Sequence, residues 1–225
     1  MRRTKLKDRV LPTYSKGEEI FNMVSHIVGG GLGVLTLIIG IIISIIHKNM
    51  YGAFSVIIFS LSMIVLYTMS SVYHGLSPNK DIAKKVMQVL DHDTIFALIA
   101  GSYTPFALCT FRNYNLYLGW GIFIFIWLFA IIGIVLNSID LKKYKVFSMI
   151  CYLLMGWCII FKASVLPMLL TIPGTILLVL GGFFYTIGAG LYGVGKKKKW
   201  MHSIFHLFIV FGNLMHIICI LIFVI

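Results

Sequence analysis

Seven long and almost uninterrupted apolar stretches run through this chain of 225 residues. A helix needs about 20 apolar residues to cross the roughly 30 Å of hydrocarbon in a bilayer, and most of the stretches reach or approach that length. Their apolar residues are continuous, whereas the strands of a membrane β-barrel alternate, so helices are expected. The stretches cover residues 22–46, 51–73, 92–110, 115–136, 146–163, 173–194 and 202–225.

The composition supports the membrane class, because 60% of the residues are hydrophobic and only 12% are charged. Soluble domains are about half apolar and about a quarter charged. The first stretch is too long for a cleaved signal peptide and lacks a small-residue cleavage site, so it is expected to remain as a span. We therefore predict an all-α, polytopic membrane protein, in which a basic cytoplasmic arm (1–17) precedes a domain of seven transmembrane helices (18–225).

The basic residues predict the orientation of the spans. Sixteen of the 19 Lys and Arg residues lie before the first stretch or after the second, fourth and sixth, and three lie on the other side. By the positive-inside rule, the N-terminus is expected in the cytoplasm and the C-terminus outside. The net charge of +12 then reflects topology and contact with anionic lipid headgroups, and no nucleic-acid partner is expected. The sixteen are Arg2, Arg3, Lys5, Lys7, Arg9, Lys16, Lys80, Lys84, Lys85, Lys142, Lys143, Lys145 and Lys196 to Lys199; the three are Lys48, Arg112 and Lys162.

Ionisable side chains gather at the predicted cytoplasmic ends of several spans. His202 and His206 open the last stretch and are four residues apart, so they share one helix face. The second stretch runs inward and ends at His74, with Ser70 one turn deeper, and the third begins at Asp91. Ionisable groups are costly at this depth, which makes them candidates for function.

Three of these residues form a candidate metal site: His74, His202 and His206. Three neutral imidazoles with an open position suit a catalytic zinc ion, which would make hydroxide available near neutral pH. Asp91 is expected to be a fourth ligand or to hold the zinc-bound water, and could act as a general base. Ser70 could donate a hydrogen bond to a substrate carbonyl or to the developing oxyanion.

Other polar residues near the predicted cytoplasmic ends of the spans have more than one interpretation. Glu18 and Glu19 could simply balance the basic arm, and only one residue of 91–93 needs to face inward. His216 lies about 15 Å deeper than His206 at the rise of a helix, which is too far to share its ion. It is expected to satisfy a buried hydrogen bond or to line a polar cavity. The residues left without a role are Glu19, Asn22, His26, His92, Asp93 and His216.

In their order along the chain, these residues resemble the hemolysin III family, the bacterial branch of the progestin and adiponectin receptor superfamily. The resemblance covers the chain from about Glu19 to His216. The family motifs appear as Glu19, Asn22, Ser25 and His26 (E-x-x-N-x-x-S/T-H), Ser70, His74 and Asp91 (S-x-x-x-H and a following aspartate), and His202 and His206 (H-x-x-x-H).

The resemblance implies seven helices, an inside N-terminus, the plasma membrane of a bacterium and a zinc site near the cytoplasmic face. His74, His202 and His206 would bind zinc directly, Asp91 would interact through the zinc-bound water, and Ser70 would lie nearby. Eukaryotic relatives look like ceramide hydrolases and hormone receptors, and bacterial members are named for haemolysis.

Three functions remain open at this point. The leading hypothesis is a zinc-dependent hydrolase that cleaves an amide or ester in a lipid, with membrane lipids as partners and a role in lipid homeostasis. The alternatives are a pore-forming cytolysin or channel, and a zinc-stabilised receptor or sensor without turnover. The sequence leaves the substrate, the existence of turnover and the oligomeric state open.

Overall fold

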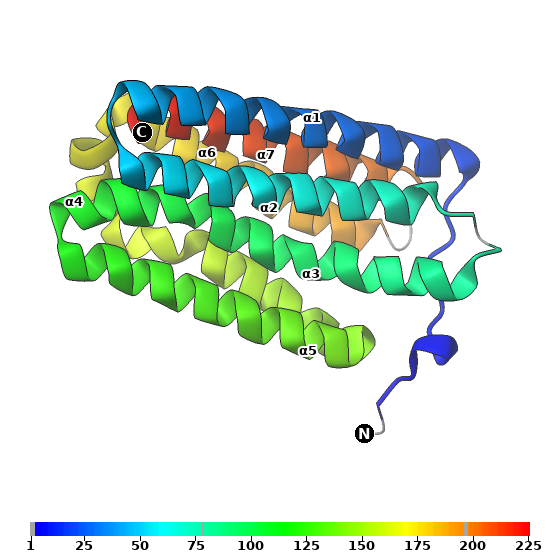
Figure 1. Cartoon of the computed structure of the whole chain (residues 1–225). Helices are drawn as coiled ribbons and strands as arrows, with labels where there is room; N and C mark the ends of the chain where they lie inside the picture. The colour runs from blue at the N-terminus through cyan, green and yellow to red at the C-terminus, as the bar shows by residue number, and fades with distance from the viewer. Residues whose placement is uncertain (1–2, 78, 196–197) are drawn as a thin grey trace.

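The computed structural model describes residues 3–77, 79–195 and 198–225. Every regular element in these residues is a helix (Figure 1), which confirms the all-α prediction. Arg2, Lys196 and Lys197, which contribute to the predicted charge asymmetry, lie outside the described residues. The elements are η1 (Leu6–Asp8), α1 (Lys16–Ile46), α2 (Met50–Gly75), α3 (Asp81–Pro105), the π-helical η2 (Phe106–Phe111), α4 (Arg112–Tyr114), α5 (Leu116–Trp157), η3 (Cys158–Val165), α6 (Leu166–Val194) and α7 (Met201–Phe223).

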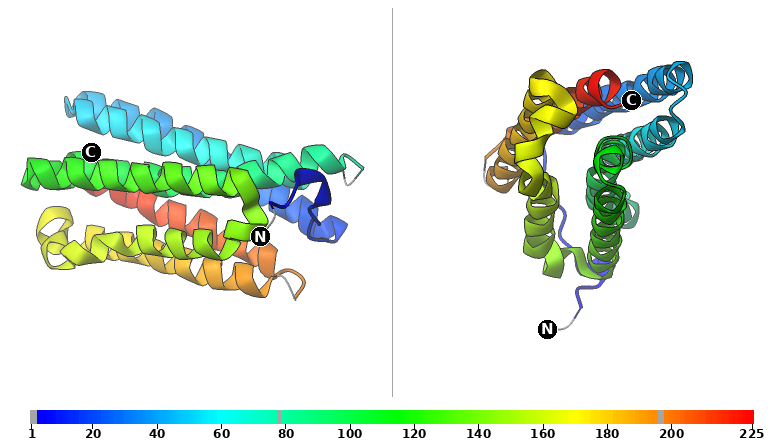
Figure 2. Two further views of the ribbon diagram at one scale, coloured as in Figure 1. Left: turned by 90° about the horizontal axis from the view of Figure 1, so that it is seen from below. Right: turned by 90° about the vertical axis from the view of Figure 1, so that its left-hand side faces the viewer.

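Among the residues that the structure describes, five helical stretches are long and apolar enough to cross a membrane, so the chain is a polytopic membrane protein. They are Lys16–Ile46, Met50–Gly75, Asp81–Tyr114, Leu116–Val194 and Met201–Phe223. The fourth contains three of the stretches that the sequence separates. Within it the backbone leaves the helical region at Asp140 (φ −158°, ψ 90°) and at Thr171 (φ 62°, ψ 171°). Figures 1 and 2 show that α5 turns back on itself between its green and its yellow-green part.

Side-chain caps fix where several helices begin. Ser15 and Glu18 form a capping box at the start of α1, in which Glu18 N donates to Ser15 Oγ and Ser15 N donates to Glu18 Oε2. This satisfies two backbone donors that the first turn leaves free. Asn49 accepts a hydrogen bond from Gly52 N at the start of α2, and Asn115 accepts one from Leu118 N at the start of α5.

Close approach of α1 and α2 depends on glycines of α1, among them Gly29, Gly33 and Gly40. A Cβ atom at Gly29 would lie 2.5 Å from the ring of Tyr67, and one at Gly33 would lie 2.9 Å from the side chain of Ile64. A Cβ atom at Gly31 would meet no described atom within 4 Å. The pair Gly29 and Gly33 therefore faces α2, as a small-xxx-small pair does at a tight helix interface.

The helices surround a common interior, as the end-on view in Figure 2 shows. Among the five candidate spans, Asp81–Tyr114 has the largest buried share, so α3 and η2 lie deepest in the bundle. One cavity in this interior is lined by residues from α1, α2, α3, α5, α6 and α7, together with Phe106 of η2 and Ile159 of η3. His202 and His206 line this cavity where α7 begins.

Candidate metal centre

Three histidines meet at one end of the bundle. His74 lies in the last turn of α2, and His202 and His206 lie in the first two turns of α7. Each is buried, and their ligand nitrogens all lie within 4.8 Å of one another. The Nε2 atoms of His202 and His206 are 3.0 Å apart, because positions i and i+4 of a helix lie on one side. The three residues could therefore hold one metal ion.

The donor atoms fit such an ion. His74 Nε2 is buried and has no hydrogen-bond partner among the described residues, and the Nε2 atoms of His202 and His206 lie 3.0 Å from each other. A buried polar atom without a partner is costly, and an unprotonated imidazole nitrogen offers a lone pair that a metal ion would satisfy. Three imidazole nitrogens suit zinc and also copper, iron or nickel. The geometry thus supports a metal centre without selecting the metal.

His74 makes a second, charged contact on its other ring nitrogen. Glu19 Oε2 lies 2.6 Å from His74 Nδ1, and Glu19 Oε1 accepts a hydrogen bond from Lys84 Nζ at 2.6 Å. Glu18 points elsewhere: it caps α1 and its Oε1 accepts a hydrogen bond from Trp200 N at 2.6 Å. The two neighbouring acids therefore have different structural roles, which their sequence positions alone do not distinguish.

Tyr14, in the segment before α1, packs against the same histidines. Its ring stacks on that of His202 with centroids 4.9 Å apart and an angle of 21°, and lies 5.7 Å from that of His74. Burial raises the pKa of the Tyr14 hydroxyl well above its ordinary value, so the side chain is neutral. Tyr14 was not predicted to belong to the site; its one signal in the sequence is an aromatic residue directly before Ser15, near the start of the first span.

The rest of the N-terminal segment crosses the same end of the bundle. Thr4 N donates to Asp140 Oδ2 at 2.7 Å, at the point where α5 breaks, and Arg3 Nε donates to Ile139 O at 2.7 Å. Lys85 Nζ of α3 donates to Lys7 O at 2.9 Å. These contacts attach the segment to α3 and α5 and bring Tyr14 over the histidines.

Ser70 and Asp91, the two predicted catalytic residues, line the interior cavity together with His202 and His206. The side chain of Ser70 is fully buried, and its Oγ has no hydrogen-bond partner among the described residues. An unpartnered hydroxyl beside a cavity is free to donate to a bound molecule. Asp91 Oδ2 lies 3.9 Å from His92 Nδ1.

The side chains of the three consecutive residues 91–93 point in two directions. Asp91 and His92 line the cavity, whereas the carboxylate of Asp93 accepts a hydrogen bond from Ser138 Oγ of α5 at 2.7 Å. His92 Nδ1 donates to Gln88 O at 2.8 Å, so its Nε2 accepts from the Tyr192 hydroxyl at 3.0 Å. Asp93 and His92 thus have structural partners, and Asp91 is the acid that faces the cavity.

His26 places a fourth imidazole beside the cluster. Its ring centroid lies 3.9 Å from that of His206, and it lines the cavity. Both of its ring nitrogens are buried and without a hydrogen-bond partner among the described residues. The group of possible metal ligands does not include His26.

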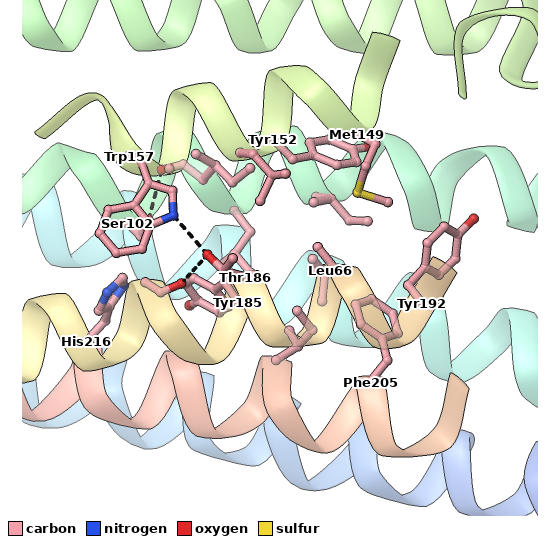
Figure 3. Close-up of a pocket in the computed structure, with 18 of the residues that line it drawn as sticks. Leu66, Ser102, Met149, Tyr152, Trp157, Tyr185, Thr186, Tyr192, Phe205 and His216 are labelled. Carbon is pink, nitrogen blue, oxygen red and sulfur yellow. Dashed lines mark hydrogen bonds between the residues drawn. The ribbon is translucent and has the colours of Figure 1, made fainter. Parts of the chain in front are cut away.

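The cavity extends from this polar end into an apolar interior (Figure 3). Tyr192 and Phe205 lie towards one end of the view, Leu66 lies near the middle, and Trp157 and His216 lie at the other end. His216 Nε2 donates to Leu178 O at 3.2 Å, which is the expected buried hydrogen bond. His216 also lines the cavity, but the cavity is mainly apolar and not the polar one that was the alternative expectation. The distance from His206 to His216 is about 15 Å along α7. The other lining residues are mainly apolar and aromatic side chains of α3, α5, α6 and α7.

The fold and the site define a class of protein: a helical membrane protein with a buried three-histidine cluster beside an elongated apolar cavity. Comparison with known families is consistent with this class. Residues 14–217 match the family described as "Haemolysin-III related", and the chain belongs to this family.

Individual relatives extend the match over nearly the whole chain. Hemolysin-3 of Bacillus cereus is 36% identical over 211 residues, which is 92% of each chain. The Hemolysin-3 homolog of Bacillus subtilis (strain 168) is 35% identical over 208 residues, 91% of this chain and 93% of the relative. The human "Monocyte to macrophage differentiation factor" is 28% identical over 163 residues, 71% of this chain and 66% of the relative. These matches confirm the resemblance to hemolysin III and to the wider receptor superfamily.

Proposed function

We propose that this protein is a zinc-dependent hydrolase that cleaves an amide or ester bond in a membrane lipid. One observation carries the proposal: the three-histidine cluster lies at the polar end of a long apolar cavity. Ser70 and Asp91 line that same cavity. A lipid needs both parts, because its acyl chain fits an apolar cavity and its carbonyl must reach the polar end.

The residues divide the chemistry between them. His74, His202 and His206 would hold a zinc ion, which lowers the pKa of a water molecule and so supplies a nucleophile near neutral pH. Asp91 would take the proton of the attacking water and return it to the leaving amine or alkoxide as the carbonyl bond to it breaks. Ser70 Oγ would donate a hydrogen bond to the carbonyl oxygen as negative charge develops there.

We also propose the full topology that the charge pattern favours. The chain would cross the bacterial plasma membrane seven times, because the breaks at Asp140 and Thr171 divide the long Leu116–Val194 stretch. Lys142 and Lys143 follow the first break. With the N-terminus in the cytoplasm, the basic arm (1–17) and the metal centre would both lie near the cytoplasmic face of the membrane domain (18–225).

The test is a search for released fatty acid. Purified protein in nanodiscs is incubated with a panel of ceramides and phospholipids, and the products are identified by mass spectrometry. We expect release from at least one lipid, loss of release in His206→Ala, and a decrease of about 100-fold or more in Asp91→Asn. Metal-loaded protein that releases no fatty acid from any lipid would contradict the hydrolase and favour a receptor or sensor without turnover.

Pore formation is the second candidate, and the names of the Bacillus relatives are the observation that favours it. An aqueous pore needs a polar lining, whereas the cavity of this chain is lined mainly by apolar side chains. Conductance measurements in pure lipid bilayers separate the two functions. A pore would give conductance that His206→Ala leaves unchanged, whereas the hydrolase predicts no protein-dependent conductance.

A further inference from the structure

The contact between Glu19 and His74 determines which nitrogen of the imidazole carries a proton. A carboxylate only accepts hydrogen bonds, so at 2.6 Å from Glu19 Oε2 the Nδ1 atom of His74 must be the donor. In the neutral ring the lone pair is then on Nε2. That atom is the buried nitrogen without a hydrogen-bond partner among the described residues. Glu19 therefore leaves on His74 the tautomer that a metal ion requires.

Asn22 is the other group near this nitrogen. Its Nδ2 atom lies 3.4 Å from His74 Nδ1. An amide nitrogen cannot donate to a ring nitrogen that already carries a proton, and this contact is 0.8 Å longer than the one to Glu19. The carboxylate therefore determines the tautomer, and Asn22 packs beside it.

Lys84 holds the carboxylate in place. Its Nζ atom donates to Glu19 Oε1 at 2.6 Å and to Leu76 O at 3.1 Å, and it lies 5.4 Å from the centre of the Tyr73 ring. The Lys84 side chain is buried, so this charge is balanced by Glu19 rather than by water. The chain of contacts runs from α3 through α1 to the histidine of α2.

We propose that Glu19 is a positioning residue for the metal centre, and that Lys84 orients Glu19. A carboxylate on the far nitrogen of a metal-binding histidine fixes the ring and makes it a stronger donor, and its loss typically weakens metal binding about 10- to 100-fold. The inference rests on the metal centre of the proposed function, but it does not require that any lipid is hydrolysed.

The experiment compares metal affinity in variants of the full-length protein. Zinc affinity is measured by competition with a chelator, and the visible spectrum of the cobalt-loaded protein reports the ligand geometry. For Glu19→Gln we expect about 10- to 100-fold weaker zinc binding and a changed cobalt spectrum. Glu19→Asp should recover part of the affinity, and Lys84→Met should lose less than Glu19→Gln because the carboxylate remains.

Asp81→Asn is the matched control, since it removes one carboxylate charge at the same end of the bundle. Asp81 pairs with Lys85 at 2.8 Å and is exposed. We expect its zinc affinity and cobalt spectrum to equal those of the unchanged protein. Equal loss in this variant would show a general charge effect and overturn the assignment to Glu19.

The outcomes separate this inference from the proposed function. Zinc affinity and a cobalt spectrum that do not change in Glu19→Gln would overturn the positioning role while the metal centre stands. Failure of the unchanged protein to bind zinc would overturn the proposed function itself. If Glu19→Gln does not fold, the zinc affinity of Glu19→Asp tests the positioning role instead. Drawing the carboxylate back by one methylene should still weaken zinc binding measurably, and an unchanged affinity would overturn the role.

Discussion

The two ends of the bundle use the same residue types for different purposes. His47, at the end of α1, is exposed, and its Nδ1 lies 3.0 Å from the backbone carbonyl of Ile225. His74, at the end of α2, is buried beside two other imidazoles and contacts Glu19. A histidine at a helix end is therefore not informative by itself. What distinguishes the two is how many helices bring ionisable side chains to the same place.

At the end of the bundle that contains His47, polar side chains cap the first turns of helices or make contacts on the surface. Asn49 and Asn115 cap α2 and α5, and the guanidinium of Arg112 lies 3.6 Å from the centre of the Tyr51 ring. At the other end, polar contacts join the N-terminal segment, α1, α2, α3 and α7. The first end stabilises the fold, and the second assembles a site.

The largest expected effect is the loss of metal from His206→Ala. Removing one of three imidazoles leaves two ligands, so bound zinc should fall from about one ion per chain to less than about a tenth. His47→Ala is the matched control and should keep the full amount. Elemental analysis of the purified proteins measures both. Equal zinc in the two variants would remove the distinction between the ends.

The next largest effect is expected where α1 packs closely against α2, between the two ends of the bundle. Gly29→Ala forces a Cβ atom into the ring of Tyr67 and should destabilise the protein by about 1–3 kcal/mol. Gly31→Ala meets no described atom within 4 Å and should be neutral or stabilising by up to about 1 kcal/mol. Unfolding of both variants in detergent gives the comparison. Similar losses in the two would contradict the close contact of α1 with α2.

Tyr14 allows the access route to the metal centre to be tested. Because its ring covers His202 and His74, Tyr14→Ala should let a chelator remove zinc faster, by roughly threefold to tenfold, equivalent to about 1 kcal/mol. Tyr117→Ala, at an exposed residue of α5, is the control and should leave the rate unchanged. Stopped-flow measurement of zinc release follows both. A rate in Tyr14→Ala equal to that of the control would show that the ring does not limit access.

The smallest effect is expected at the cap of α2. Asn49→Ala removes the acceptor for Gly52 N and should cost about 1 kcal/mol of stability, with zinc affinity unchanged. Thermal unfolding and chelator competition measure the two quantities on one sample. A fall in zinc affinity would show that the two ends are coupled, because the fold at one end would then set the geometry of the histidines at the other.

The convergence of His74, His202 and His206 was predictable from the sequence. The number and direction of the apolar stretches give the depth of each residue, and helical spacing places His202 and His206 on one face. Both can be read from a single sequence, because neither depends on how the helices pack against one another. The two parts of α5 also appear in the sequence as separate stretches, with the break at Asp140 in the polar run between them.

The contacts of Glu19 and Tyr14 could not be predicted in the same way. The rotation of α1 about its axis decides whether Glu18 or Glu19 faces His74, and that rotation follows from packing against α2. The position of Tyr14 depends on the path of a segment held by Thr4 and Lys85, which are far apart in the sequence. Zinc binding and the roles of Ser70 and Asp91 stay predictions.

X-ray absorption at the zinc edge tests the central claim most directly. Protein purified from cells grown with zinc should contain about one zinc ion per chain, with three imidazole nitrogens at about 2.0–2.1 Å and one further light-atom ligand. Protein that contains no zinc, or zinc without histidine ligands, would contradict the account.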